Sequence, residues 1–166
     1  MILILYYRSY TYVYVYIYVH IHIMSEQINE YVRSHNILCA DQSGFVKGRS
    51  CTTVLTDIVE NLRADLDNNM ICILVLLDHS KAFDTVYHSI LLKKLEKLFC
   101  FSQTSCRLLR SYLTRRSQIV SYNGTCSESI DDDDRGVPQG SVIGPLSFCL
   151  YINDLPDTLK HCKIHM

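Results

Sequence analysis

The chain has 166 residues, with 16 lysines and arginines against 17 aspartates and glutamates, and its formal net charge is −1. This balance excludes a general attraction to nucleic acid, so any basic footprint must be local. The length allows a single domain with a core or a part of a larger protein. The eight cysteines contain no Cys-x-x-Cys pair, so their spacing predicts neither a zinc knuckle nor a disulfide framework. We therefore expect free thiols in a reducing intracellular compartment, the nucleus or the cytoplasm.

Residues 10–23, YTYVYVYIYVHIHI, alternate strictly between Tyr or His and Thr, Val or Ile, and this period of two predicts a β-strand. Residues 2–23 have about the length of a membrane span, about 20 residues, but Arg8 and the Tyr and His side chains are poor material for a lipid core, so we expect no membrane partner. The codons of these residue types can all alternate pyrimidine and purine. We favour a translated simple-sequence repeat, and place residues 1–23 outside the fold and one domain at 24–166.

A basic loop that contains glycine, ADQSGFVKGRSCTT, precedes the first predicted helix. Apolar residues recur in that helix at three- and four-residue spacing: Cys51, Leu55, Ile58, Leu62 and Leu66. The sequence DNN ends the helix. Residues 70–77 then form a continuous apolar run, which predicts a strand buried on both faces with Asp78 at its C-terminal end.

Two further helices are predicted after this strand. In SILLKKLEKLF, Ser89 is placed to cap the first turn, and the apolar stripe consists of Leu91, Leu95 and Leu98. The next helix begins at about Ser102 and carries Cys106, Leu109 and Leu113 on one face.

The last third of the chain combines a hairpin with another helix. QIVSYNGTCSESI has Asn-Gly between two short alternating runs, which predicts a β-hairpin. GVPQGSVIGPLSFCLYINDLP opens as a Gly/Pro turn and becomes helical from about Ser141, with Pro145 in the first turn. Helices and strands alternate in this order, so the predicted fold class is α+β.

Asp78 is a candidate functional residue, because the C-terminal end of a buried strand is a usual place for a binding or catalytic group. If Asp78 is considered alone, an ordinary N-cap of the helix that follows is the better explanation. Its context favours a functional role, since DHSKAF and GVPQGS occur in this order with a helical stretch and a hairpin between them.

The ordered set of segments QSGFVKGRS, LLDHSKAFDTVYHSILLKKL, SYLTRRSQIV and GVPQGSVIGPLSFCLYINDLP resembles the reverse transcriptase domain of LINE-type (non-LTR) retrotransposons, over residues from about 41 to 166. The resemblance implies a right-hand polymerase, of which this chain supplies part of the fingers and most of the palm. RNA template, DNA primer and dNTP are the partners implied.

The same resemblance implies roles for individual residues. Asp78 matches the first catalytic aspartate of the palm, which binds two Mg²⁺ ions, because two cations must hold the attacking and leaving oxygens in line. Phe83 matches the aromatic residue beneath the incoming sugar, with core packing as the alternative. Gln139 and Gly140 match the PQG turn, where backbone approaches nucleotide and template. In the fingers loop, Lys47 and Arg49 match contacts to template and phosphate, with a solvated basic loop as the alternative.

One concentrated basic region is opposed only by Glu96. Its members are Lys93, Lys94, Lys97, Arg107, Arg110, Arg115 and Arg116. Such a region can follow a nucleic-acid backbone without sequence preference, but it is also common on the outer faces of exposed helices.

The chain departs from the family pattern in one important respect. The palm needs two further aspartates in a YADD hairpin, and the chain ends at KHCKIHM, where that hairpin is expected. The segment YIND is no substitute, because Asn replaces a carboxylate and Pro156 follows closely. We therefore expect a truncated domain that does not catalyse alone, with stable Mg²⁺ binding in doubt. The alternative is a non-enzymatic relic or a nucleic-acid-binding module.

Overall fold

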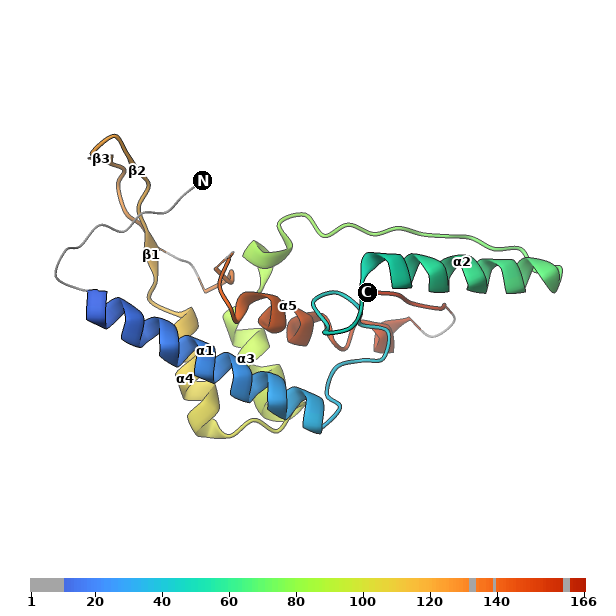
Figure 1. Ribbon diagram of the computed structural model, residues 1–166, viewed down its shortest axis with the longest axis horizontal. Coiled ribbons are helices and arrows are strands. Elements are labelled where there is room, and N and C mark those ends of the chain that lie inside the picture. Colours follow the sequence, from blue (N-terminus) through green and yellow to red (C-terminus); the bar gives the residue numbers. More distant parts are fainter. Residues whose placement is uncertain (1–10, 132–133, 139, 160–161) are drawn as a thin grey trace.

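The computed structural model describes residues 11–131, 134–138, 140–159 and 162–166. Within these residues the chain combines helices with short antiparallel strand pairs, as an α+β fold does (Figure 1). The elements are α1 (Thr11–Ser34), α2 (Cys51–Asp67), η1 (Ala82–Thr85), α3 (His88–Lys97), α4 (Gln103–Leu113), β1 (Ser117–Gln118), β2 (Ser121–Tyr122), β3 (Thr125–Cys126), β4 (Ile130–Asp131), α5 (Gly144–Ile152) and η2 (Pro156–Thr158).

The core lies where α3, α4 and α5 pack together with the C-terminal half of α1 (Figure 1). Its largest fully buried side chains are Leu91, Leu95, Leu113, Ile143, Val86 and Cys149. Burial of such side chains supplies the main driving force for this arrangement. The hydroxyl of Tyr31 in α1 also donates to the carbonyl oxygen of Phe99 at 3.0 Å, which fixes α1 on the segment between α3 and α4.

Helices α3 and α4 follow the predicted apolar stripes with two differences. Ser102 caps α4, because its hydroxyl accepts a hydrogen bond from the amide of Ser105 at 3.1 Å. Ser89 does not cap α3, since that helix begins one residue earlier and no side chain caps it. Leu98 lies just after the end of α3 and is 56% exposed, so it is not part of the buried stripe. The buried leucines of α3 are Leu91, Leu92 and Leu95.

The strand prediction for residues 10–23 is wrong, because residues from Thr11 onward belong to the 24-residue helix α1. The physical reason lies further along the chain, where Ile21, Ile28 and Val32 recur at helical spacing and pack on the core. The packed turns establish the helix, and extending it towards the N-terminus needs no new nucleus. Tertiary packing therefore overrides the β-propensity of the Tyr and Val residues. The predicted division after residue 23 falls inside α1, and it stays a prediction.

No helix in the described part of the chain is both long enough and apolar enough to cross a membrane.

The predicted buried strand at residues 70–77 is also wrong. The chain leaves α2 through Asn69, whose φ is 57°, and residues 71–79 are extended without a partner strand. Ile71 is 93% exposed and Leu76 is 82% exposed. A strand is stable only when neighbours pair with it, and no described segment occupies either edge of this one. In Figure 1 this segment returns from the far end of α2 towards η1.

Two local predictions are confirmed. The pair Ser121↔Cys126 and its neighbours form the hairpin β2–β3, and Asn123 (φ 47°) and Gly124 (φ 80°) both have positive φ, as a type I′ turn requires. Helix α5 carries Pro145 in its first turn, where the missing amide proton has no helical partner to lose.

Candidate functional site

The two segments that carry the DHSKAF and GVPQG motifs are bonded to each other. Residues 83–88 and 134–137 run antiparallel, although about fifty residues separate them in the chain. Three backbone hydrogen bonds join them: Val137 N to Phe83 O at 2.9 Å, Gly136 N to Val86 O at 2.8 Å and His88 N to Asp134 O at 2.9 Å. The fold therefore brings the two motifs into one short ladder next to α5.

A buried histidine, which the sequence analysis did not single out, closes this ladder. His88 is 2% exposed, and its Nε2 lies 2.6 Å from the carbonyl oxygen of Gly136. Because a carbonyl can only accept, Nε2 carries the proton, and the buried Nδ1 has no partner among the described residues. Gly136 has a φ of 96°, and a Cβ there would lie 3.6 Å from the carbonyl oxygen of Asp84. The backbone conformation at position 136 thus favours glycine.

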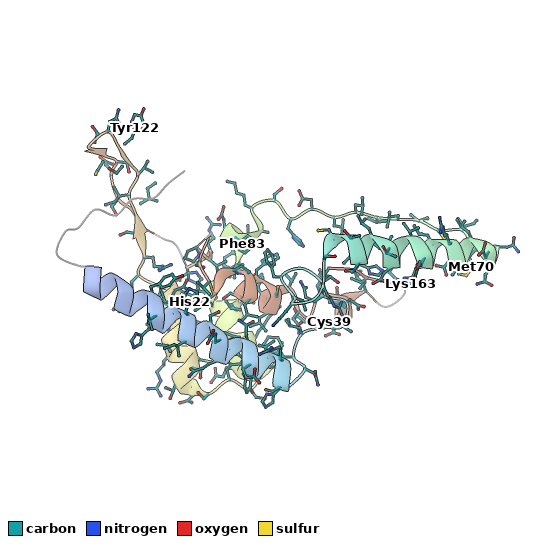
Figure 2. All side chains as sticks on the ribbon, viewed as in Figure 1. His22, Cys39, Met70, Phe83, Tyr122 and Lys163 are labelled. Carbon is teal, nitrogen blue, oxygen red and sulfur yellow. The ribbon has the colours of Figure 1, made fainter. Side chains whose placement is uncertain are left out.

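Phe83 sits between two other aromatic rings. Its centroid lies 5.9 Å from that of Phe45 in an edge-to-face arrangement and 5.2 Å from that of Phe148 in α5. Figure 2 shows Phe83 close to α5. The side chain is half-buried, so its ring joins the loop at residues 40–50, η1 and α5 while keeping part of its surface open. The packing alternative is therefore realised, and contact with a sugar stays a prediction.

The two cations of the predicted fingers loop behave differently. The Arg49 guanidinium donates to the carbonyl oxygen of Ala40 at 2.7 Å and to the Ser43 hydroxyl at 3.1 Å. It therefore holds the loop in shape. Lys47 is exposed, and no described side chain bonds to it.

A polar hollow of about 380 Å³ lies beside Arg49. Its walls come from the loop at residues 40–50, the first turns of α2 and His165 near the C-terminus, and they include the carboxylates of Asp41 and Asp57. Two carboxylates next to one engaged guanidinium are a poor environment for a phosphate.

Three side chains missed by the sequence analysis attach residues 37–44 to α5 and its C-terminal cap. The Gln42 amide donates to the carbonyl oxygen of Gly44 at 2.9 Å and lies 3.5 Å from the Cys149 sulfur. The Cys149 thiol also donates to Gly44, and burial raises the pKa of this thiol to about 11. Asn153 accepts from the amide of Cys39 at 2.7 Å and donates to the carbonyl of residue 37. No local pattern signals these contacts, because the partners are more than 100 residues apart.

The PQG turn is described in part. Gly140 has a φ of 81° and is exposed, and a Cβ there would meet nothing within 4 Å. The amide of Ser141 donates to the carbonyl oxygen of Pro138 at 3.1 Å, which closes the turn ahead of α5. The backbone conformation explains the glycine without any ligand. Gln139, the other predicted residue of the turn, lies outside the described residues.

Asp78 lies on the exposed extended segment after α2. Nowhere in the described ranges do three or more His, Cys, Asp or Glu side chains come together as metal ligands. Mg²⁺ needs six oxygen ligands in octahedral geometry, and the two-ion arrangement needs carboxylates shared between the ions. One carboxylate does not fit that requirement. We therefore derive no catalytic step through a metal ion for this arrangement.

The predicted basic region divides into two engaged and five exposed cations, and one of the exposed ones, Arg107, also donates to the carbonyl oxygen of Gln103 at 3.4 Å. The Lys94 ammonium donates to the carbonyl of Tyr151 at 2.6 Å and pairs with Asp154, so it joins α3 to the end of α5. Arg116 lies over the ring of Tyr112, 4.7 Å from its centroid. The exposed cations are Lys93 and Lys97 on α3, Arg107 and Arg110 on α4, and Arg115 just after it.

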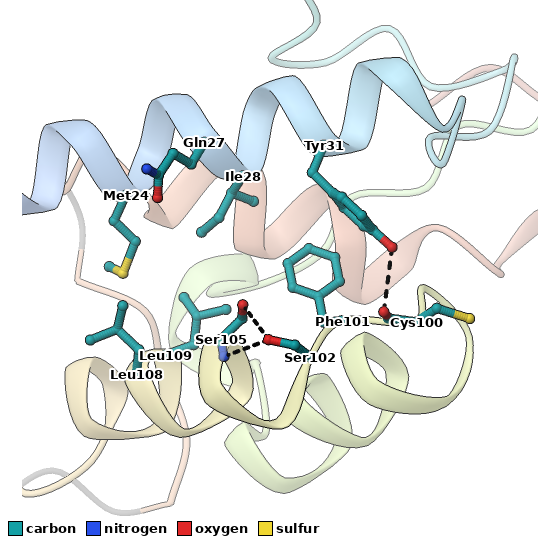
Figure 3. A pocket seen from close by; sticks show the side chains of 10 residues that line it. All are labelled: Met24, Gln27, Ile28, Tyr31, Cys100, Phe101, Ser102, Ser105, Leu108 and Leu109. Carbon is teal, nitrogen blue, oxygen red and sulfur yellow. Dashed lines mark hydrogen bonds between the residues drawn. The ribbon is translucent and has the colours of Figure 1, made fainter.

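A second hollow, of about 340 Å³, separates α1 from the start of α4 (Figure 3). Ile28, Phe101 and Leu109 give it a mostly apolar wall. Figure 3 shows the Tyr31 hydroxyl reaching across it to the carbonyl of Cys100. None of the residues predicted to bind substrate lines this hollow.

Comparison with known proteins identifies the class. The family model described as reverse transcriptase (RNA-dependent DNA polymerase) matches residues 15–166. The chain therefore belongs to the reverse transcriptase family, and the resemblance to LINE-type enzymes is confirmed.

Similar curated proteins come from transposons of Drosophila melanogaster. The probable RNA-directed DNA polymerase from transposon BS is 33% identical over 135 residues, which are 81% of this chain and 14% of that protein. The probable polymerase from transposon X-element is 32% identical over 134 residues, again 81% and 14%. The polymerase from mobile element jockey is 33% identical over 69% of this chain and 12% of its own length. The chain thus spans about a seventh of the relatives that it matches. No solved structure matches it at a significant level.

Proposed function

We propose that this chain forms part of the fingers and palm of a polymerase that copies RNA into DNA, and that it does not catalyse this reaction by itself. The observation that carries the proposal is the ladder between residues 83–88 and 134–137, because it joins the two motifs most specific to the family. RNA template, DNA primer and dNTP are the partners in this proposal.

The roles follow the family motifs. Asp78 would supply one carboxylate to the metal ions, and the remaining ligands would come from residues that the described structure does not bring to it. Phe83 would offer the open part of its ring to the sugar. The turn at Gly140 would let backbone approach the nucleotide, since no side chain projects there. Lys47 is better suited than Arg49 to contact phosphate, because Arg49 is already bonded within its own loop.

The absence of independent catalysis is testable by primer extension. We expect the purified chain to extend no primer on an RNA template with Mg²⁺ or Mn²⁺, because losing ligands from a two-metal site costs several powers of ten in rate. Asp78→Ala should then change nothing. Template-dependent extension that disappears in Asp78→Ala would show that the chain assembles a working site, and would overturn this part of the proposal.

A second function, weak binding of nucleic acid without sequence preference, is favoured by the exposed cations of α3, α4 and the residue that follows them. Phosphate contacts give affinity but carry no base information. Lys94 is not part of this surface, because its ammonium pairs with Asp154. The competing hypothesis, an inert relic of a retrotransposon, predicts no binding at low salt.

Fluorescence anisotropy with labelled RNA and an RNA–DNA duplex distinguishes these hypotheses. Each phosphate contact should contribute a slope of roughly −0.7 to −0.9 in a plot of log K against log salt concentration. Lys97→Glu should weaken binding and reduce this slope. Arg63→Glu on α2 makes the same change in charge at an exposed position outside the basic region, and should have little effect. Equal effects of the two variants, or binding indifferent to salt, would contradict a binding surface on α3 and α4.

For location we propose a reducing compartment inside the cell, supported by eight cysteines that are all unpaired.

A further inference from the structure

The tip of the hairpin β2–β3 carries an exposed Asn-Gly pair. Figure 1 shows β2 and β3 at the far end of an arm that extends away from the helices, and Figure 2 labels Tyr122 there. Asn123 and Gly124 follow Tyr122, and both are exposed. A Cβ built on Gly124 would meet nothing within 4 Å. Water therefore reaches both residues of the turn, and nothing crowds the glycine.

The backbone amide of Gly124 distinguishes this pair from a second asparagine in a similar conformation. Asn69 is also exposed and has a φ of 57°, close to the 47° of Asn123. The amide that follows Asn69, that of Met70, donates to the carbonyl oxygen of Asp65 at 3.0 Å at the end of α2. No described residue accepts a hydrogen bond from the Gly124 amide. The Gly124 nitrogen is therefore free to lose its proton to solvent and to react.

We propose that Asn123 is a site of self-modification, at which the side-chain amide is converted to a carboxylate. The Gly124 nitrogen gives up its proton to hydroxide and attacks Cγ of Asn123, so that a C–N bond forms and a succinimide ring closes. The bond from Cγ to Nδ2 breaks, and Nδ2 takes a proton from water and leaves as ammonia. Water then opens the ring at either carbonyl carbon and gives aspartate or isoaspartate. The overall change consumes water and releases ammonia, and it does not depend on the proposed polymerase function.

The closed turn slows this reaction, and opening of the hairpin allows it. A type I′ turn holds ψ of its first central residue near about +30°. The succinimide ring closes only when the Gly124 nitrogen eclipses Cβ of Asn123, so this ψ has to rotate far from its value in the turn. The strands β2 and β3 are joined by two residue pairs whose side chains are all exposed, so opening costs little. The reaction therefore proceeds from the open hairpin.

The two products have different effects on the hairpin. Aspartate tolerates a positive φ, and Asp-Gly is itself a favoured type I′ pair, so this product keeps the turn. In isoaspartate the main chain runs through the former side chain and gains a methylene group. The two-residue loop does not accept that extra atom, so the pairing of β2 with β3 should be lost. Formation of isoaspartate therefore converts the tip of the arm from a closed to an open form.

The first experiment follows the purified full chain over time, at several pH values, by peptide mass spectrometry. We expect the peptide that contains Asn123 to gain about one mass unit, at a rate that rises with pH because the attacking amide must lose its proton. The peptide that contains Asn69 is the internal control. It should react at least roughly tenfold more slowly, since the amide that follows Asn69 is bonded and has a side chain beside it. Equal rates at the two asparagines would overturn the proposal, as would an unchanged Asn123 after a free peptide SYNGTCS has reacted completely.

The second experiment uses proline to test whether opening of the hairpin sets the rate. Thr125→Pro removes an amide from the pair next to the turn, so it should raise the rate at Asn123 by roughly two- to tenfold, because a two-stranded hairpin is marginally stable. Ser129→Pro is the matched control, since it lies in the same arm but outside the strands, and it should leave the rate nearly unchanged. A rate that does not respond to Thr125→Pro, or that rises equally in the control, would overturn reaction from the open hairpin.

The third experiment compares the two products, which are isomers of the same mass and charge. The Ser127 amide donates to the carbonyl oxygen of Val120 at 2.9 Å, beside the β2–β3 pairs. After the products are separated by chromatography, hydrogen exchange at Ser127 should be slower in the aspartate fraction than in the isoaspartate fraction. Equal exchange in the two fractions would overturn the predicted opening of the arm.

Discussion

Truncating Leu95 is the most direct test of where the core lies. Leu95 is 2% exposed on α3 and belongs to the cluster that joins this helix to α4 and α5. Leu95→Ala removes buried methyl groups and leaves a cavity, which costs about 2 to 5 kcal/mol in the free energy of unfolding. Leu98 carries the same side chain on the same stretch of chain but is 56% exposed, so Leu98→Ala should change stability by no more than about 0.5 kcal/mol.

Urea unfolding followed by circular dichroism measures both effects. With an m-value of about 2 kcal/mol/M, Leu95→Ala should lower the midpoint by about 1 to 2.5 M, and Leu98→Ala should leave it nearly unchanged. Titrations at two protein concentrations should give the same midpoint, which shows that self-association does not alter the transition. The apolar pattern alone treats Leu95 and Leu98 as equivalent positions of one stripe. Equal shifts in the two variants would refute the core assignment and the position at which α3 ends.

Two further measurements test buried polar groups. Burial raises the pKa of the Cys149 thiol to about 11, above its usual value of 9.0, so the folded state keeps this proton to higher pH than the unfolded state does. The contribution of this thiol to stability is fully present below pH 9 and should fall between pH 9 and 11, with a slope of at most about 1.4 kcal/mol per pH unit. Urea titrations at several pH values should show this loss in the original chain and not in Cys149→Ala. His88→Phe keeps a ring but removes the donor to the Gly136 carbonyl, so it should lower the free energy of unfolding by about 1 to 3 kcal/mol. His79→Phe makes the same change at an exposed position and should lower it little. Similar urea midpoints for the two variants would contradict a structural role for the His88 hydrogen bond.

The predicted site residues fall into two groups: some are held against the core by contacts, and Asp78 is not. Phe83 stacks on α5, the 134–137 segment is hydrogen-bonded to residues 83–88, and residues 37–44 are hydrogen-bonded to α5 and its C-terminal cap. These contacts form a scaffold that does not depend on Asp78. Asp78 lies on the open segment before η1. A polymerase site therefore requires that this segment be covered and that further carboxylates reach Asp78. For this reason we propose that the chain does not catalyse by itself.

Features that depend on neighbours in the sequence were predictable. The helix α2, the start of α4 near Ser102 and the Asn123–Gly124 turn were all predicted. The two helices follow from apolar residues three or four positions apart, and the turn follows from two residues that tolerate positive φ. The ordered motifs also placed the chain in its family, because their order is a property of the sequence alone.

Tertiary structure decided what depends on distant partners. The apolar run at 70–77 predicts a buried strand, but burial needs a neighbouring strand, which a single segment cannot specify. The helix α1 forms against its own β-propensity, because its later turns pack on the core. The bond from His88 to Gly136 spans 48 residues, and the pair Lys94–Asp154 spans 60. Such pairs meet only after the chain has folded, and the free energy that joins them comes from exclusion of water and from satisfied polar groups, which no local pattern records.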